Sequence, residues 1–175
     1  MYHTKFIYLI LAFSFLLSCK SKKTVSNNEN YFLQEISCPE SGDCIFEVLK
    51  DSNLEIKKDD FGKFYPEIIA GDKVVIKYHF KKSEEKNIAD NNYSEYIYLE
   101  VNKNKEHLIL KDKELQKVKL LFGRICFCRG SMGYFKVTQG ELFLFNNNGI
   151  INMKLKFKVN KVPQIITEIN ENIRY

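Results

Sequence analysis

A strictly alternating run near the C-terminus, residues 151–159, most constrains the fold of this chain. Successive side chains of an extended strand point to opposite faces, so the pattern places an apolar face against a core and a polar face in solvent. On a helix the same apolar residues would scatter around the axis, because the helical period is about 3.6 residues. The run therefore predicts a half-buried β-strand with the inward residues Ile151, Met153, Leu155, Phe157 and Val159.

Similar short runs, separated by glycine and asparagine turns, recur along the chain. Residues 141–145 precede the C-terminal run across three asparagines and a glycine, which predicts a hairpin because these residue types tolerate positive φ. The segment 142–145 is apolar on both faces, which predicts a central or doubly covered strand. The other predicted strands are 45–49 and 54–57, joined as an early hairpin over residues 51–53, then 73–81, 93–101, 107–110, 118–122 leading into 125–128, and 134–138.

These strands predict an all-β, mainly antiparallel fold, either a sandwich or a barrel of about eight to ten strands. We also predict a short C-terminal helix over Pro163–Ile173, where isoleucines recur at helical spacing behind a proline, although β-branched side chains argue against it. Residues 31–175 are expected to form a single β-rich domain, which is long enough for one core. No internal repeat or second-domain boundary is visible in the sequence.

The segment before this domain has the layout of a secretory signal peptide. Residues 1–18 hold Lys5, an apolar run and the small residue Ser18 before Cys19, and the run is shorter than the about 20 residues that a membrane-spanning helix needs. The sequence Leu-Leu-Ser-Cys at residues 16–19 resembles the lipobox of the bacterial lipoproteins. The resemblance implies that Cys19 becomes the first mature residue and carries the acyl chains that anchor the protein.

The residues after Cys19 extend the same prediction. Residues 19–30 are expected to be the acylated cysteine and a flexible tether, because the single apolar side chain after it, Val25, cannot offset the ordering entropy. Lys20, rather than an aspartate, follows the cysteine, which is similar to the outer-membrane members of the lipoprotein class. The resemblance implies a cell-envelope location, as an outer-membrane lipoprotein of a Gram-negative bacterium, with the periplasmic and surface-facing orientations both open.

Four further cysteines, Cys38, Cys44, Cys126 and Cys128, are disulfide candidates in an oxidising envelope. On an extended strand the Cα atoms of Cys126 and Cys128 would lie about 6.6 Å apart. Their side chains would point the same way, so their Cβ atoms would be farther apart than the Cβ–Cβ distance of about 3.5–4.5 Å in a disulfide. We therefore expect both to be linked to Cys38 and Cys44. The alternative is local pairing of Cys38 with Cys44, with Cys126 and Cys128 either in a strained bond or free. The spacing of the four cysteines matches zinc and redox motifs poorly.

Motifs for catalysis and for nucleic-acid binding are weak in this chain. His79 and His107 stand in no recognisable catalytic setting, and Ser131 lacks the Gly-x-Ser-x-Gly spacing of a nucleophile elbow. The chain carries 27 lysines and arginines against 22 acids, interspersed rather than clustered, which argues against nucleic acid. Catalytic residues therefore remain unidentified, and no metal site or cofactor is expected.

A binding surface is the remaining functional signal. Tyr96 and Tyr98 share the strand face opposite Ile97 and Leu99, and stacked tyrosines bind sugars or partner proteins, or simply cover a sheet. We expect a lipid-anchored envelope module for binding or scaffolding, without catalytic activity, whose partners are the membrane and an envelope protein or glycan. The alternatives are an envelope hydrolase with scattered carboxylates and a small-ligand carrier with a barrel cavity.

Overall fold

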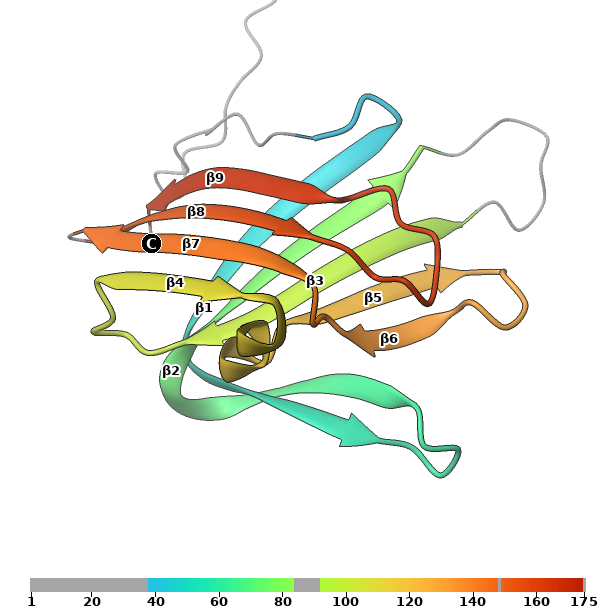
Figure 1. The fold of residues 1–175 in the computed structure, drawn as a ribbon, viewed down its shortest axis with the longest axis horizontal. Coiled ribbons are helices and arrows are strands. Elements are labelled where there is room, and N and C mark those ends of the chain that lie inside the picture. Colours follow the sequence, from blue (N-terminus) through green and yellow to red (C-terminus); the bar gives the residue numbers. More distant parts are fainter. Residues whose placement is uncertain (1–37, 84–91, 148, 175) are drawn as a thin grey trace, which may run out of the picture. The chain divides into compact units, whose positions relative to one another are not determined.

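The computed structural model describes residues 38–83, 92–147 and 149–174, and two antiparallel sheets dominate this part of the chain (Figure 1). One short 3-10 helix, η1 (Asp112–Val118), follows β4 within the described residues. The first sheet has the order β1 (Gly42–Lys58), β2 (Phe64–Lys82), β3 (Tyr93–Val101), β5 (Leu121–Cys126) and β6 (Gly133–Lys136). The second has the order β4 (His107–Lys111), β7 (Gly140–Asn147), β8 (Ile150–Phe157) and β9 (Glu168–Arg174). The prediction of an all-β, mainly antiparallel fold is confirmed, and the arrangement is sandwich-like.

The core lies between the two sheets and uses the inward halves of the alternating strands. On β8, Ile151, Met153 and Leu155 are at most 1% exposed, as the strict alternation predicts. The rings of Phe122 on β5 and Phe157 on β8 approach with centroids 5.9 Å apart, so aromatic packing joins one sheet to the other. Burial of these side chains is the main favourable term that holds the sheets together.

The first strand departs from the sequence prediction. β1 runs through residues 51–53 without a turn, so the early hairpin predicted there is wrong. Asp51 instead takes a φ of 52°, and the register with β2 shifts around it as a β-bulge, which bends a strand pair and increases its twist. Opposite the bulge, a Cβ at Gly71 would lie 2.1 Å from the side chain of Asn53, so glycine there allows the close approach.

The paired residues 52–58 and 64–70, called the arm below, curl back beneath the first sheet (Figure 1). Leu54 of the arm is fully buried in a second, smaller core against Val75, Tyr98 and Leu121 on the outer face of that sheet. A bridge from Phe64 to β6 ties the arm to the far edge. The arm therefore covers part of the outer face of its own sheet.

A buried carboxylate on β3 holds the arm in place. Glu100 is 5% exposed and accepts a hydrogen bond of 2.7 Å from the backbone N–H of Leu54. Lys73 and Lys119 donate to the same carboxylate over 2.6 and 2.9 Å. Burial raises the pKa of Glu100, but the hydrogen bonds from Lys73, Lys119 and Leu54 outweigh it, so the pKa lies below its ordinary value.

A second buried carboxylate on the same strand points the other way. Glu95 is fully buried on the core side and accepts hydrogen bonds from the backbone N–H groups of Ile165 and Ile166, at 2.6 and 2.7 Å. Tyr93 donates its hydroxyl to Glu95 as well. The segment before β9 is therefore fixed to the opposite sheet by hydrogen bonds to one acid.

The predicted C-terminal helix is wrong. Residues 168–174 form β9, paired antiparallel with β8 from Glu168 to Arg174. The β-branched isoleucines disfavour a helix, and β8 offers an unpaired edge where 168–174 can alternate, with Ile169 inward at 1% exposure.

The disulfides are local. Cys38 pairs with Cys44 at a Cα–Cα distance of 5.6 Å, and Cys126 pairs with Cys128 at 5.2 Å. The predicted cross-link between the two pairs is therefore wrong, and the local alternative holds for Cys38 and Cys44. The extended-strand distance does not apply to the second pair, because β5 ends at Cys126 and the chain bends at Phe127.

The first prediction concerns the acid that holds the arm. Glu100→Gln should lower the free energy of unfolding by about 1.5–3 kcal/mol, the range for hydrogen bonds to charged groups, because an amide has one acceptor oxygen and carries no charge. Because the folded pKa is lowered, this stabilisation is complete above the unfolded pKa of about 4.3 and is lost as the pH falls through the folded value. Urea unfolding at several pH values measures both effects.

Glu67→Gln is the matched control, because Glu67 lies on the arm in an exposed ion pair with Lys57 and should change stability little. Hydrogen exchange at the Leu54 amide should accelerate in Glu100→Gln and stay slow in the control. Equal stability of the two variants would contradict the role given to Glu100.

The second prediction concerns the disulfides. Trypsin cleaves after lysine and arginine, so Cys38 and Cys44 fall in one peptide, 24–50, and Cys126 and Cys128 in another, 125–129. Without reductant the two peptides should appear as separate species in the mass spectrum. The mass of each should be lower than that of its reduced form by two hydrogens, which are lost in its own disulfide. A joined species in the mass spectrum, which reduction splits, would show cross-linking instead.

Candidate functional site

The predicted tyrosine surface lies on the outer face of the first sheet, opposite Ile97 and Leu99 as the alternation requires. The arm covers this face at Tyr98, whose side chain is 7% exposed, while Tyr96 is half-buried. Tyr96 stacks on His79 with ring centroids 4.2 Å apart and planes 5° apart. The structure brings the two predicted tyrosines together, and Tyr96 keeps more accessible surface than Tyr98.

These rings, from His79 through Tyr96 and Tyr98 to Tyr134, form a row of aromatic contacts across the sheet, and the three tyrosines pack in the second core. A Cβ at Gly123 would lie 2.4 Å from the ring of Tyr134, so this ring packs directly over the glycine. Burial raises the pKa of the Tyr98 and Tyr134 hydroxyls above the ordinary value, so both stay protonated at neutral pH. Burial, with the charges of Lys77 and Lys81, lowers the pKa of His79, which keeps its ring neutral there. The row holds neutral, hydrogen-bonding rings.

The outer face of the second sheet carries a different arrangement, in two rows of side chains. The register aligns one residue from each strand per row, so that each row crosses β4, β7, β8 and β9 in turn. We call these two rows the Phe–Asn face: His107, Phe145, Asn152 and Asn172 in the first row, and Ile109, Phe143, Lys154 and Asn170 in the second.

The half of the Phe–Asn face over β4 and β7 is mostly apolar and is accessible, with His107 as its one polar side chain. Ile109 is 63% exposed, Phe143 38% and Phe145 40%. The ring of His107 lies 4.5 Å from that of Phe145, centroid to centroid. β7 is central in its sheet, as predicted, yet no described residue covers its outer aromatic side chains. Exposed aromatics of this size, set side by side, mark an interaction surface.

The half over β8 and β9 carries three amides and Lys154. Asn152, Asn170 and Asn172 share one open groove with Phe143 and Phe145, and its volume is about 260 Å³. Among the described residues, no side-chain hydrogen bond occupies these three amides, so their donors and acceptors face the groove and solvent. An amide offers two N–H donors and a carbonyl acceptor, which suits a ligand that also donates and accepts.

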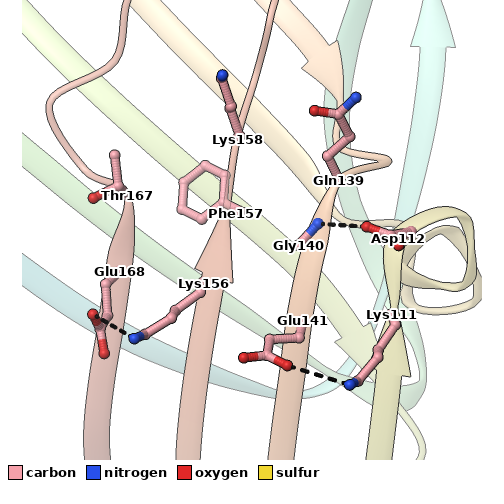
Figure 2. Close-up of a pocket in the computed structure, with 10 residues that line it drawn as sticks. All are labelled: Lys111, Asp112, Gln139, Gly140, Glu141, Lys156, Phe157, Lys158, Thr167 and Glu168. Carbon is pink, nitrogen blue, oxygen red and sulfur yellow. Dashed lines mark hydrogen bonds and ion pairs between the residues drawn. The ribbon is translucent and has the colours of Figure 1, made fainter.

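A third row, next to the Phe–Asn face, consists of alternating charges and lines a neighbouring pocket of about 530 Å³ (Figure 2). Lys111 pairs with Glu141 at 3.7 Å, and Lys156 pairs with Glu168 at 3.5 Å. These side chains are accessible, so each pair contributes little stability. The row neutralises itself and leaves little net charge to attract an ion.

The other predicted residues occupy structural positions or lie elsewhere. Ser131 accepts a hydrogen bond of 2.7 Å from Arg124, which fixes the turn before β6. Cys19 lies outside the described residues. Within residues 38–83, 92–147 and 149–174, no cluster of three His, Cys, Asp or Glu side chains is placed to hold a metal ion. In the same part of the chain no helix has the length and apolarity to cross a bilayer.

The comparisons with known proteins found no matching family model, no similar curated protein and no similar solved structure.

The Phe–Asn face was not singled out from the sequence, although its signal is present. Residues 142–145 are apolar on both faces, and a sandwich covers one face of each sheet with its partner sheet, so the second face remains accessible unless another segment covers it. The asparagines at 152, 170 and 172 alternate with inward residues, but their alignment with Phe143 and Phe145 depends on the register of three strands.

Proposed function

We propose that this protein is a lipid-anchored binding module of the cell envelope, and that it binds its partner through the Phe–Asn face. The observation that carries the proposal is the exposure of Phe143 and Phe145, at 38% and 40%, on a central strand. Beside them lie three asparagine amides that make no side-chain hydrogen bond to the described residues. Aromatic side chains supply large contact areas in binding sites, and adjacent polar groups supply orientation.

The hydrolase alternative has weaker support. Two of the three buried acids among the described residues, Glu95 and Glu100, accept hydrogen bonds from backbone N–H groups and from lysines, and these bonds hold the fold together. A general acid or base must reach the proton that it transfers in a bound substrate. Both carboxylates are at most 5% exposed, which keeps substrate away from them.

The carrier alternative also has weaker support. A carrier encloses its ligand, whereas the space between these two sheets is filled by side chains such as Ile97, Phe122 and Leu155, all at most 1% exposed. The grooves on the Phe–Asn face and beside it are open to solvent. An open groove suits a long or surface-bound partner better than an enclosed small molecule.

The third prediction concerns the anchor. The lipobox at residues 16–19 predicts that the native N-terminal peptide begins at an acylated Cys19. Mass spectrometry of that peptide measures the modification, and Cys19→Ala should prevent it and release or mislocalise the protein. An unmodified Cys19, or a mature terminus at another residue, would contradict the anchor. Ser18→Ala is a suitable control, because it keeps a small residue before the cysteine.

The fourth prediction concerns the face. Replacing both Phe143 and Phe145 with Thr removes the rings, retains a residue that favours strands, and should abolish co-sedimentation of the protein with native envelope fractions. The matched control is Tyr65→Thr, because Tyr65 is 39% exposed and lies on the arm. Thermal unfolding verifies the fold of each variant, and the anchor is removed from all of them by Cys19→Ala. Unchanged sedimentation of the double variant, or equal loss in the control, would refute binding by this face.

A further inference from the structure

We propose that the Phe–Asn face binds a glycan chain, an inference that rests on the proposed function and names its ligand class. The carrying observation is the division of the face along the strands. Aromatic and aliphatic side chains, with the ring of His107 among them, stand on β4 and β7. Three amides and Lys154 stand on β8 and β9, in the same two aligned rows. A ligand that fits both halves must itself have an apolar surface bordered by groups that donate and accept hydrogen bonds.

A pyranose unit has this division. The face of a sugar ring presents polarised C–H groups, which suit the electron-rich face of a phenyl ring, and its rim carries hydroxyls. A hydroxyl donates one hydrogen bond and accepts others, so it pairs with either end of an asparagine amide. Stacking on Phe143 or Phe145 would bring the hydroxyl rim toward Asn152, Asn170 and Asn172, which line the same groove.

The dimensions of the groove favour a chain over a single small molecule. Its volume of about 260 Å³ lies below the about 300–1,000 Å³ of pockets that enclose a whole ligand. Phe143 and Phe145 are two residues apart on β7, which spaces them by roughly 7 Å along the strand. Two neighbouring sugar units can therefore stack on the two rings while the rest of the chain extends past the open ends.

Other ligand classes fit the same residues less well. An apolar protein surface would bury the three amides without hydrogen-bond partners, which is unfavourable. A nucleic acid or a phosphate-rich ligand needs several cations, whereas Lys154 is the lysine within the two rows and the next row pairs its own charges. Lys154 instead serves as a further donor, beside the groove, to a hydroxyl or an acidic substituent of the glycan.

The fifth prediction tests this inference with the full chain, purified in a detergent that has no sugar headgroup. An array of oligosaccharides built from hexose and N-acetylhexosamine units, with and without uronates, identifies the probe, and calorimetry measures its dissociation constant. The variant F143T/F145T removes the stacking rings, and N170A/N172A removes two amides. Each should weaken binding by about tenfold or more, because the first variant loses the stacking contacts with the sugar rings and the second leaves sugar hydroxyls without hydrogen-bond partners.

Two controls isolate the face. Y65T removes an equally exposed ring on the arm, and N102A removes an exposed amide outside the strands, and neither should change the dissociation constant. Glycan binding that survives in both face variants would overturn the site. Failure of every oligosaccharide to bind would overturn the ligand class. The proposed function would still stand if F143T/F145T, with the anchor removed, no longer co-sedimented with envelope fractions. If F143T/F145T kept both glycan binding and co-sedimentation with envelope fractions, the glycan inference and the proposed function would both be overturned.

Discussion

The rest of the structure depends on the hydrogen bonds that two buried glutamates of β3, Glu95 and Glu100, accept from distant segments of the chain. The two glutamates lie on opposite faces of the strand, because residues 95 and 100 differ in parity along it. Glu95 binds backbone N–H groups of Ile165 and Ile166 across the core, and Glu100 binds that of Leu54 in the arm. A buried carboxylate is costly unless its oxygens are satisfied, so each acid requires a particular segment at a particular place.

This arrangement determines which surfaces remain open for binding. The sheets cover each other's inner faces, and the arm, held by Glu100, covers Tyr98 on one of the two outer faces. Among the described residues nothing comparable covers the outer face of the second sheet at Phe143 and Phe145. The arm therefore covers part of one outer face and leaves the candidate site, on the other sheet, accessible.

Alternation predicted most of the strands, because a half-buried strand must place apolar residues at every second position. The alternation failed to predict the structure where pairing with a neighbouring strand, rather than the local sequence, determined the conformation. A turn was predicted at residues 51–53, but continued pairing with β2 made Asp51 a bulge. A helix was predicted near the C-terminus, but the open edge of β8 made residues 168–174 a strand. The bend after Cys126 allowed a local disulfide that an extended strand would forbid.

The sequence by itself determined the fold class and the inward face of most strands, since both follow from the local period of apolar residues. It also determined that one glutamate had to find partners, because Glu95 interrupts the apolar positions 93, 97, 99 and 101. The tertiary structure alone decided the disulfide pairing, the cover over Tyr98 and the alignment of Phe143 with Asn170. These depend on strand register and long-range closure, which bring together residues whose separation along the chain carries no record of their contact.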